Sequence, residues 1–587
     1  MRRGQTIQDW LDRFGAAVAN GDADGAAALF GAECYWRDLL AFTWNIKTME
    51  GRADIATALR ATLGTTRPVG WQVRERDSDD SAWISFDTAS GVCTGRITLR
   101  DGAGFVLFTA LADLKGHAEP RGATRPLGLV HRADRQRQTW AERRAREVNG
   151  YETGTQPYVV IIGGGQGGLA LGARLKALGV PALIVEQNAR AGDSWRNRYR
   201  SLTLHDPVWY DHMPYLPFPE GWPVFTPKDK MGDWLEAYAL MFELDLWTST
   251  TCEAASFHGD VWSVQVRRNG KPITLRPRHL VFATGAYGPP KTLSLPGQAQ
   301  FRGPFLHSSA YQSGADFAGK QCVVIGAASS AHDVAVDLWE AGAKVTMIQR
   351  SPTIVVRSET LMELGFELYS EAALARGIST DRADMSAAAT PYGLFAGQQR
   401  ALYRRIRERD AEFYRRLAAS GFALDFGEDD SGLMMKALRT ASGYYIDVGA
   451  SELIIAGEIK VMAGRSVTGL TAGGLRLDDG SEVTADAIIA CTGYQSMHET
   501  VAAMVSRRAA DLVGPCFGLG SGVRGDPGPW QGELRNLWKP TAHPALWFHG
   551  GNLALSRFYS RFVALQLKAR LEGIATPVYG LAAPPGG

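Results

Sequence analysis

Apolar residues in the first 120 positions change from a helical to a strand-like spacing. Over residues 6–30 they recur every three or four positions, which predicts a helix that is interrupted by a turn at 21–24 and then resumes. Between residues 71 and 114, four short stretches alternate apolar and polar side chains, and this period predicts antiparallel strands. Helices followed by a curved sheet indicate a small α+β domain over 1–120.

Two later segments repeat one order of elements: an apolar strand, a turn containing glycine, a helix and a second apolar strand. The first begins at Tyr158 and the second at Gln321, so the sequence predicts two α/β units in one chain. Residues 121–156 are polar, carry a predicted charged helix near 134–148 and are typical of an interdomain linker. Residues 358–440 are charged and predicted to be mainly helical, as an elaboration of the second unit.

Composition narrows the class of protein. The 63 basic and 61 acidic residues give a formal net charge of +2, so neither nucleic acid nor an anionic membrane is expected as a partner. The Arg-rich stretch 404–409 is interpreted as the exposed face of a helix. No apolar run approaches the ~20 residues of a spanning helix and no signal peptide is evident, so we expect a cytoplasmic protein. The six cysteines form no CxxC pair, which predicts reduced thiols, and no metal site is predicted.

The first unit carries a glycine loop between its first strand and its helix. Gly163 permits a tight turn, Gly165 lets the backbone approach a pyrophosphate at the helix N-terminus, and Gly168 allows close packing of helix on strand. Glu186 and Gln187 follow the second strand, where a carboxylate accepts hydrogen bonds from ribose hydroxyls and repels a 2′-phosphate. We expect FAD at this site, rather than NADPH.

The second unit departs from this fingerprint. Gly326 opens its loop, but Ala328 stands where the middle glycine is expected and puts a Cβ where a phosphate comes close. An arginine rather than an acid ends its second strand, and a guanidinium suits a 2′-phosphate, so we expect NADPH there and leave NADH open. The residues expected to bind this nucleotide are Gly326, Ala328, Ser329, Ser330, Ala331, Arg350 and Ser351.

Two dinucleotide units imply a flavin that takes hydride from a nicotinamide and passes electrons to a disulfide or to dioxygen. The missing CxxC or CxxxxC pair disfavours the disulfide. The segment Phe301-Arg-Gly303-Pro-Phe-Leu-His307-Ser-Ser-Ala-Tyr311 resembles the flavin-containing monooxygenase fingerprint, FxGxxxHxxx followed by Tyr or Phe. Baeyer–Villiger enzymes of the neighbouring class usually carry Trp where Tyr311 stands. Further segments similar to that family lie in order at 192–196, 217–239, 283–285, 491–494 and 548–566.

This resemblance implies a FAD-dependent NAD(P)H:O2 monooxygenase that inserts one oxygen atom into a small organic substrate through a flavin C4a-(hydro)peroxide. Baeyer–Villiger oxidation of ketones and oxygenation of nitrogen or sulfur both stay open. A peroxide-forming NAD(P)H oxidase and a non-oxygenating flavin reductase are the alternatives. The resemblance also carries four further cofactor-binding residues onto this chain, namely Ser194, Trp195, Gly493 and Tyr494.

One position differs from the family pattern. Where an Asn of the family helps to hold the flavin peroxide, this chain has His205, followed by Asp206. An imidazole donates a hydrogen bond and also changes charge near neutral pH, which an amide does not. The chain is in this respect most similar to the bacterial type II members, which have an N-terminal extension, oxidise ketones and in several cases accept both nicotinamides. The alternative is a structural histidine held by Asp206.

Asp206 and His307 complete the candidate catalytic set. We expect His307 to orient the nicotinamide or a linker, or to serve packing, rather than to donate a proton.

The N-terminal domain is similar to the SnoaL-like, ketosteroid-isomerase-like cone fold, through residues 10–30, 34–38 and 51–55. Such cones host many functions, and some use an Asp as a base. Asp38 is a candidate, but Trp36-Arg37-Asp38 is more typical of a helix-to-strand corner with a satisfied ion pair. We expect the domain to cover the flavin domain as a lid or to serve as a dimer module, and a homodimer stays open.

The predicted fold class is therefore α/β, with two Rossmann-like dinucleotide-binding domains, for FAD and NAD(P)H, behind a small α+β cone. The predicted division is a cone domain over 1–120, a linker with a helix over 121–156, a first part of the FAD-binding domain over 157–317, an NAD(P)H-binding domain over 318–445 and a second part of the FAD-binding domain over 446–587.

Overall fold

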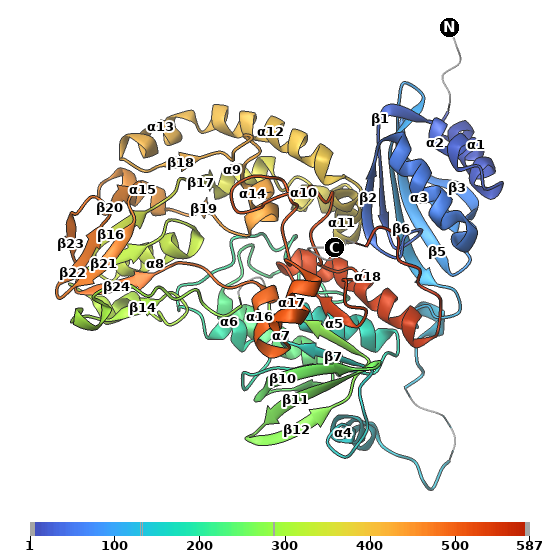
Figure 1. The fold of residues 1–587 in the computed structure, drawn as a ribbon, viewed down its shortest axis with the longest axis horizontal. Helices are drawn as coiled ribbons and strands as arrows, with labels where there is room; N and C mark the ends of the chain where they lie inside the picture. Colours follow the sequence, from blue (N-terminus) through green and yellow to red (C-terminus); the bar gives the residue numbers. More distant parts are fainter. Residues whose placement is uncertain (1–5, 129–130, 132, 286–287, 582–587) are drawn as a thin grey trace.

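The N-terminal part of the chain folds into one curved sheet covered by helices (Figure 1). The computed structural model describes residues 6–128, 131, 133–285 and 288–581, so four of the five predicted ranges contain a few residues outside it. The sheet order is β2-β1-β6-β5-β4-β3, and β1 and β6 run parallel while the other pairs are antiparallel. The elements are α1 (Ile7–Ala19), α2 (Ala23–Ala28), β1 (Phe30–Leu39), β2 (Ile46–Glu50), α3 (Gly51–Thr66), β3 (Val69–Ser78), β4 (Ser81–Asp87), β5 (Gly91–Arg100) and β6 (Ala103–Leu114).

The helices α1 and α2 and the four strands β3–β6 confirm the elements that the periodicity of the apolar residues predicts. The sequence did not indicate β1 and β2, because β1 is buried from Trp36 to Leu39 and so lacks the alternation of a half-exposed strand.

The first α/β unit is a five-stranded, fully parallel sheet in the order β25-β13-β7-β8-β9. Its inner strands are short apolar runs buried on both faces, as parallel strands between helices require. The elements are β7 (Val159–Ile162), α5 (Gln166–Ala177), β8 (Ala182–Val185), α6 (Asp193–Arg196), α7 (Lys228–Met241), β9 (Leu246–Trp247), β13 (His279–Phe282), β25 (Leu546–Phe548) and α18 (Leu553–Leu571).

The second unit is also a five-stranded, fully parallel sheet, in the order β14-β24-β15-β16-β20, and differs in that its edge strand β14 precedes the others along the chain whereas β25 follows them. Its elements are β14 (Phe305–His307), β15 (Gln321–Ile325), α8 (Ser329–Glu340), β16 (Lys344–Gln349), α15 (Ala450–Ile455), β20 (Ile459–Ala463) and β24 (Ala487–Ala490). Three of these strands, β14, β20 and β24, lie outside the range 318–445 that the sequence assigns to this unit. Two Rossmann-like units in one chain confirm the predicted fold class.

Each unit also has a small antiparallel sheet, inserted between β9 and β13 in the first unit and between β20 and β24 in the second. The order is β10-β11-β12 in the first unit and β21-β22-β23 in the second. The strands are β10 (Thr250–His258), β11 (Val261–Arg268), β12 (Lys271–Leu275), β21 (Val467–Thr471), β22 (Gly474–Leu477) and β23 (Glu482–Thr484).

The stretch predicted as a helical elaboration is mainly helical, with a small sheet in the order β18-β17-β19. It contains β17 (Thr353–Arg357), α9 (Ser358–Leu364), α10 (Glu371–Ala375), α11 (Thr380–Ala388), α12 (Tyr392–Arg409), α13 (Ala411–Ala419), β18 (Leu424–Asp425), α14 (Gly432–Thr440) and β19 (Tyr444–Asp447). The arginines at 404–409 are exposed on α12, as predicted.

The remaining elements are α4 (Trp140–Gly150), α16 (Met497–Met504), α17 (Arg507–Val513) and the 3₁₀ turns η1 (Gly122–Thr124), η2 (Gln298–Gln300) and η3 (Gly314–Phe317). The linker helix α4 begins six positions later than the sequence predicts.

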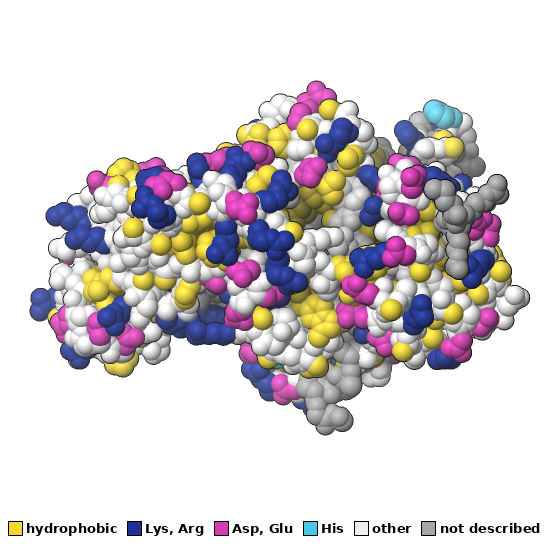
Figure 2. Space-filling model, turned by 90° about the horizontal axis from the view of Figure 1, so that it is seen from above, with side chains coloured by type: hydrophobic (Ala, Val, Ile, Leu, Met, Phe, Trp, Pro, Cys, Tyr) yellow, Lys and Arg dark blue, Asp and Glu magenta, His cyan; other side chains and the backbone are white. Residues whose placement is uncertain are grey.

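Buried apolar side chains form one continuous core through the N-terminal domain and the first unit, and a second core in the second unit and the helical elaboration. In Figure 2, basic and acidic side chains are interspersed over the face in view, in keeping with the near-zero net charge. None of the described helices is long and apolar enough to cross a bilayer.

Candidate functional site

The two glycine loops occupy equivalent places in their units. Gly163 and Gly326 adopt φ angles of +111° and +129°, which favour glycine, and their N–H groups donate to Val185 and Ile348 across the sheet. A Cβ on Gly163 would lie 2.5 Å from the carbonyl oxygen of Ala283. These first glycines are therefore fixed both by backbone conformation and by a close neighbouring strand.

The third loop position differs between the units. A Cβ on Gly168 would lie 1.9 Å from the carbonyl oxygen of Gly163, so only glycine lets α5 pack this closely on its loop. The second unit has Ala331 at this place, buried behind the corresponding loop.

The middle loop position takes the same ordinary backbone conformation in both units. Gly165 has φ −76° and ψ −171°, and Ala328 has φ −98° and ψ −174°; each is the N-cap of the helix that follows. Alanine at 328 therefore causes no backbone strain, and at this position the two loops differ only by its Cβ.

Three segments far apart in sequence meet around the first loop. Gly167 of α5 lies beside the 549–552 segment, where a Cβ on it would come 3.2 Å from the Cα of Gly550. The Thr284 hydroxyl and both ring nitrogens of His549 are buried there without a hydrogen-bond partner among the described residues. Buried polar atoms of this kind need partners. A cradle of glycines lined by unsatisfied polar groups fits a dinucleotide such as FAD.

The carboxylate of Glu186 is already positioned by its own loop. Its Oε2 accepts a hydrogen bond from the Gly164 N–H at 2.7 Å, and its Oε1 accepts two from Asn188, at 2.8 and 2.6 Å. A carboxylate offers about four acceptor positions, so roughly one remains for a ribose hydroxyl. Gln187 is exposed beside it.

Ser194 and Trp195, in the short helix α6, lie on the open side of the first loop. The Ser194 hydroxyl oxygen would be 3.6 Å from a Cβ on Gly165, so it faces the position where a pyrophosphate is expected. Trp195 is half-buried and packs against the core of the first unit.

Around the second loop, the N-terminus of α8 is bonded by residues from β19 and from the segment after β24. Ser329 donates to the Tyr444 carbonyl oxygen of β19 at 3.0 Å, and the Ser330 carbonyl oxygen accepts from the Cys491 thiol at 3.7 Å. Arg350 is exposed at the end of β16 beside half-buried Ser351, and no hydrogen bond or ion pair joins its guanidinium to another described residue. Arg350 is thus available to an anionic ligand.

His205 lies where the two units face each other. The half-buried imidazole forms no hydrogen bond with the described residues, although its charge acts on two carboxyl groups, Asp206 beside it and Asp333 on α8. Burial raises the pKa of Asp206 and of Asp333, and His205 opposes that rise in both. The structure shows no hydrogen bond between His205 and Asp206, so it does not support the alternative in which Asp206 holds His205 as a structural residue.

His307 connects the linkers between the two units. Its Nε2 lies 3.0 Å from the Gly493 carbonyl oxygen and so carries the proton, while its Nδ1 accepts from the Ser309 N–H at 3.1 Å. Burial lowers the pKa of His307, which favours this neutral form. The ring also meets Tyr494 edge to face, with centroids 5.3 Å apart. Because both ring nitrogens are hydrogen-bonded, His307 is suited to holding the linkers in place rather than to donating a proton.

Sequence reasoning missed several residues of this region. Tyr199 donates to Asp333 at 2.6 Å, and Asn552, the N-cap of α18, donates to the Tyr210 hydroxyl at 3.3 Å and bonds Asp206. Asn552 lies within the family-like segment 548–566, which was the available signal for it, whereas Tyr199 and Tyr210 belong to no motif singled out in the sequence.

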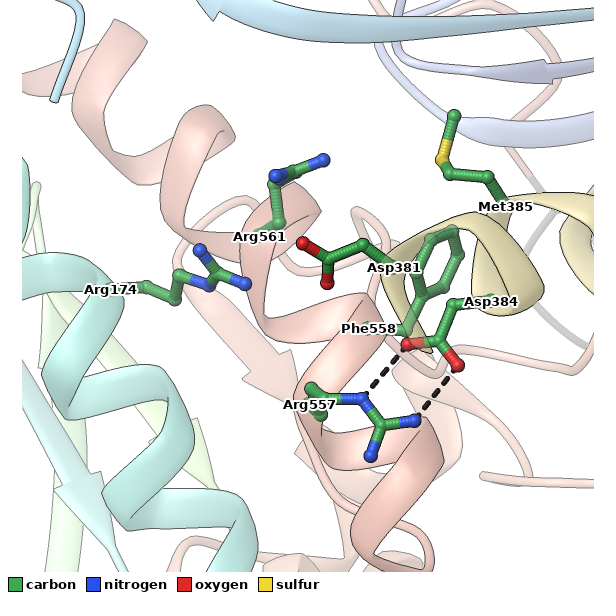
Figure 3. A pocket seen from close by; sticks show the side chains of 7 residues that line it. All are labelled: Arg174, Asp381, Asp384, Met385, Arg557, Phe558 and Arg561. Atoms are coloured by element: carbon green, nitrogen blue, oxygen red, sulfur yellow. Dashed lines mark hydrogen bonds and ion pairs between the residues drawn. The ribbon is translucent and has the colours of Figure 1, made fainter. Parts of the chain in front are cut away.

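Deeper along α18, Arg557 forms a buried bidentate pair with Asp384 of α11, both distances being 2.8 Å (Figure 3). The same guanidinium donates to the carbonyl oxygens of Tyr210 and His212, and so ties the segment after His205 to α18. Arg174 and Arg561 line the same small pocket and lie beside Asp381 (Figure 3). This pocket is separate from His205.

Asp38 is a satisfied structural carboxylate. Its oxygens accept hydrogen bonds from the N–H groups of Phe42 and Thr43 and from the hydroxyls of Thr43 and Thr109, at 2.6–3.1 Å. The predicted corner is wrong: Trp36, Arg37 and Asp38 lie within β1. The predicted ion pair exists, but it joins Arg37 to Glu533, 496 positions away.

Comparison with known proteins agrees with this geometry. A family model described as pyridine nucleotide-disulphide oxidoreductase matches residues 160–390. Indole-3-pyruvate monooxygenase YUCCA1 of Oryza sativa subsp. japonica is 33% identical over 342 residues, which cover 58% of this chain and 77% of the relative.

The chain belongs to the flavin-containing monooxygenase family. Two solved structures share its fold. OTEMO in complex with FAD and NADP is 17% identical with a TM-score of 0.51, over 72% of this chain and 86% of that one. Cyclohexanone monooxygenase with bound ε-caprolactone is also 17% identical with a TM-score of 0.51, over 71% and 88%. The likeness of the N-terminal domain to the SnoaL-like fold stays a prediction.

All six cysteines of this monooxygenase are free, and five of them are buried. No disulfide of the kind that the description of the matching family model names joins any two of them in this structure.

Proposed function

We propose that this monooxygenase binds FAD at its first unit and NADPH, ahead of NADH, at its second, and inserts one atom of dioxygen into a small carbonyl compound. The observation that carries the proposal is the contrast between the residues that follow the second strand of each unit. The first unit has the fixed carboxylate of Glu186 there and the second has the exposed guanidinium of Arg350, while His205 stands between the units without a hydrogen-bond partner among the described residues.

The residues of the first unit fit FAD. Gly163 and Gly165 leave room for a pyrophosphate, the N-terminus of α5 favours its charge, and Glu186 keeps an acceptor for a ribose hydroxyl. Thr284 and His549 supply buried polar atoms that need partners. FAD bound there would accept hydride from the nicotinamide and deliver electrons to dioxygen.

The second unit supports NADPH. The Arg350 guanidinium offers charge-assisted hydrogen bonds to a 2′-phosphate, with Ser351 as a further donor. His307 and Gly493 hold together the linkers between the two units and would thereby help to orient the two cofactor sites toward each other.

The proposed task of His205 is to hold or move a proton next to the reacting oxygen. Its imidazole lies between two carboxyl groups of raised pKa, Asp206 and Asp333, which exchange protons nearer to neutral pH than ordinary carboxyls. A group that changes charge there decides whether the oxygen attacks a carbonyl carbon or is transferred to a soft nitrogen or sulfur atom.

A carbonyl substrate is favoured by the relatives. Their names specify indole-3-pyruvate, a 2-oxo acid, and cyclohexanone, a cyclic ketone. Both present a carbonyl carbon to a nucleophilic oxygen, so Baeyer–Villiger oxidation is proposed ahead of oxygenation at nitrogen or sulfur. A peroxide-forming oxidase is the second candidate, because it would share every cofactor contact described here.

The test is NADPH and NADH consumption by the purified yellow protein, with product and hydrogen peroxide measured together. A cyclic ketone, a 2-oxo acid, a sulfide and a tertiary amine are offered in parallel. We expect ester, lactone or decarboxylated acid with little peroxide. Sulfoxide or amine oxide alone would replace the Baeyer–Villiger assignment, and peroxide alone would make the protein an oxidase. A protein that FAD does not bind would overturn the proposal.

A further inference from the structure

The N-terminal domain docks on the rest of the chain through one buried arginine. Arg37, 1% exposed, projects from β1 and forms a bidentate pair with Glu533, 2% exposed, with both distances 2.7 Å. The same guanidinium donates to the Ala388 carbonyl oxygen of α11 at 2.6 Å and to the Tyr559 hydroxyl of α18 at 3.2 Å. All four hydrogen bonds cross the domain boundary, so Arg37 is satisfied only when the domain is docked.

One of these partners, Tyr559, leads to the flavin region. The ring of Tyr559 stacks on that of Trp538 with centroids 3.8 Å apart and an angle of 3°. Trp538 in turn donates from its indole N–H to the Gly550 carbonyl oxygen at 2.9 Å. Arg37 is therefore joined to the 549–552 segment by two buried aromatic side chains.

That segment is one wall of the proposed FAD site. Gly550 approaches Gly167 of the first loop and has φ +151°. His549 before it has two unsatisfied ring nitrogens, and Asn552 after it caps α18 and bonds Asp206. A shift of the Gly550 carbonyl would move all of these groups together.

We propose that Arg37 of the N-terminal domain is a positioning residue for the flavin site, because it fixes the 549–552 wall through Tyr559 and Trp538. The inference rests on the proposed FAD site. It makes the N-terminal domain a structural part of the oxygenase site.

The chemistry of the pair explains why docking is tight. Breaking a buried ion pair leaves a charge without its partner away from water, which is strongly unfavourable. Glu533 also accepts from the Thr48 hydroxyl of β2 at 2.7 Å, so the carboxylate is held by two strands of the N-terminal domain. A domain attached in this way imposes its position on α18.

The test compares matched variants in the full chain by titrating apoprotein with FAD. Arg37→Lys keeps the charge near Glu533, but a single ammonium cannot serve Glu533, Ala388 and Tyr559 as a guanidinium fork does. Trp538→Phe keeps a ring on Tyr559 and removes the donor to Gly550. Both are expected to raise the dissociation constant for FAD about tenfold and to alter the visible circular dichroism of bound flavin.

The controls cross the same domain boundary without touching α18. Arg382 pairs with Asp77 and Glu75, each at 3.1 Å, and Trp530 donates to Glu50 at 2.9 Å. Arg382→Lys and Trp530→Phe are expected to leave the FAD dissociation constant within about twofold of wild type.

The inference is overturned if Arg37→Lys lowers the melting temperature while FAD affinity and the flavin spectrum stay as in wild type. If Arg37→Lys does not fold, Tyr559→Phe decides, because it removes the hydroxyl that Arg37 reaches and keeps the stack on Trp538. An unchanged FAD affinity in both Tyr559→Phe and Trp538→Phe would overturn this inference but would leave the proposed function standing. A wild-type protein that does not bind FAD would overturn the proposed function as well.

Discussion

The hydroxyl of Tyr199 donates a hydrogen bond of 2.6 Å to Oδ2 of Asp333 and thereby joins the first nucleotide-binding unit to the helix of the second. One turn further along that helix, Asp337 accepts from Tyr311 at 2.5 Å and from the Gly314 N–H at 2.6 Å. The two tyrosines thus fasten neighbouring linker segments to one face of α8. The charge of His205 acts on Asp333 and opposes the rise in the pKa of that carboxyl.

Tyr199→Phe is expected to disturb catalysis and stability together. It leaves the largely buried carboxyl of Asp333 without its hydroxyl donor, which costs about 1–3 kcal/mol, and it loosens the unit that His205 faces. We expect a lower free energy of unfolding and a larger fraction of NADPH oxidised to hydrogen peroxide. Tyr311→Phe is the matched control, because Asp337 keeps the Gly314 donor; its peroxide fraction should equal that of wild type. Equal peroxide fractions from both variants would show that the Tyr199–Asp333 hydrogen bond has no particular role in coupling NADPH oxidation to oxygenation.

His205→Ala is expected to raise the ratio of hydrogen peroxide to oxygenated product. The change removes an imidazole that has no hydrogen-bond partner among the described residues, and so keeps its donor and its capacity to change charge for a ligand. His205→Asn, which installs the residue type of the wider family, restores a donor without the charge change. Its coupling should recover while its dependence on pH becomes flatter. Unchanged coupling in His205→Ala would remove His205 from the mechanism.

The glycine loops were predictable because their requirements are local. Gly163 needs a positive φ and Gly168 an absent Cβ, and both needs are set by residues within one strand–turn–helix unit. The N-terminal strands after residue 69 were predictable for a similar reason, since adjacent hairpins leave an alternating pattern.

The contacts that assemble the site were not predictable in this way. Arg37 and Glu533 are 496 positions apart, and Tyr199 and Asp333 are 134 apart. A buried polar side chain in an apolar stretch indicates that a partner exists, but it does not identify the partner. The same limit explains why β14, β20 and β24 were not assigned to the second sheet, because strand order is a property of the folded chain.

Arg350→Ala is expected to weaken the binding of NADPH much more than the binding of NADH. A charge-assisted hydrogen bond contributes about 1.5–3 kcal/mol, so the KM for NADPH should rise about tenfold to a hundredfold. The KM for NADH should change less than about threefold, because NADH lacks the 2′-phosphate. Arg350→Lys, which keeps a point charge, should fall between. An equal loss with both nicotinamides would show that Arg350 does not read the phosphate.

Gly168→Ala is expected to abolish tight FAD binding and to lower the melting temperature. The new Cβ would lie 1.9 Å from the Gly163 carbonyl oxygen, so α5 must move away from the loop that it caps. Gly64→Ala is the control, since Gly64 lies in α3 with nothing within 4 Å of its added Cβ. That change should stabilise the protein by roughly 0.5–1 kcal/mol. Normal FAD affinity in Gly168→Ala would mean that the helix is not held at this distance.

Asp38 should make the stability of the N-terminal domain depend on pH. Burial raises the pKa of Asp38 to about 6, against the hydrogen bonds that it accepts from Thr109 and Thr43. A carboxyl with a raised pKa in the folded state stabilises the fold fully below its unfolded pKa, near 3.8, and loses that contribution as the pH rises to about 6. At about 1.4 kcal/mol per pKa unit, the loss is on the order of 3 kcal/mol.

Asp38→Asn isolates this effect, because the amide does not titrate. Its oxygen can take the bonds from Phe42 and Thr43, and its NH₂ can donate to the Thr109 hydroxyl, which already accepts from Trp36 at 2.8 Å and can turn its own proton away. Denaturant unfolding at pH 4 and pH 6.5 should therefore show the wild type losing more stability than Asp38→Asn over this interval. Parallel losses in the two proteins would mean that Asp38 is ionised in the folded state throughout, and that its hydrogen bonds outweigh the cost of burying its charge.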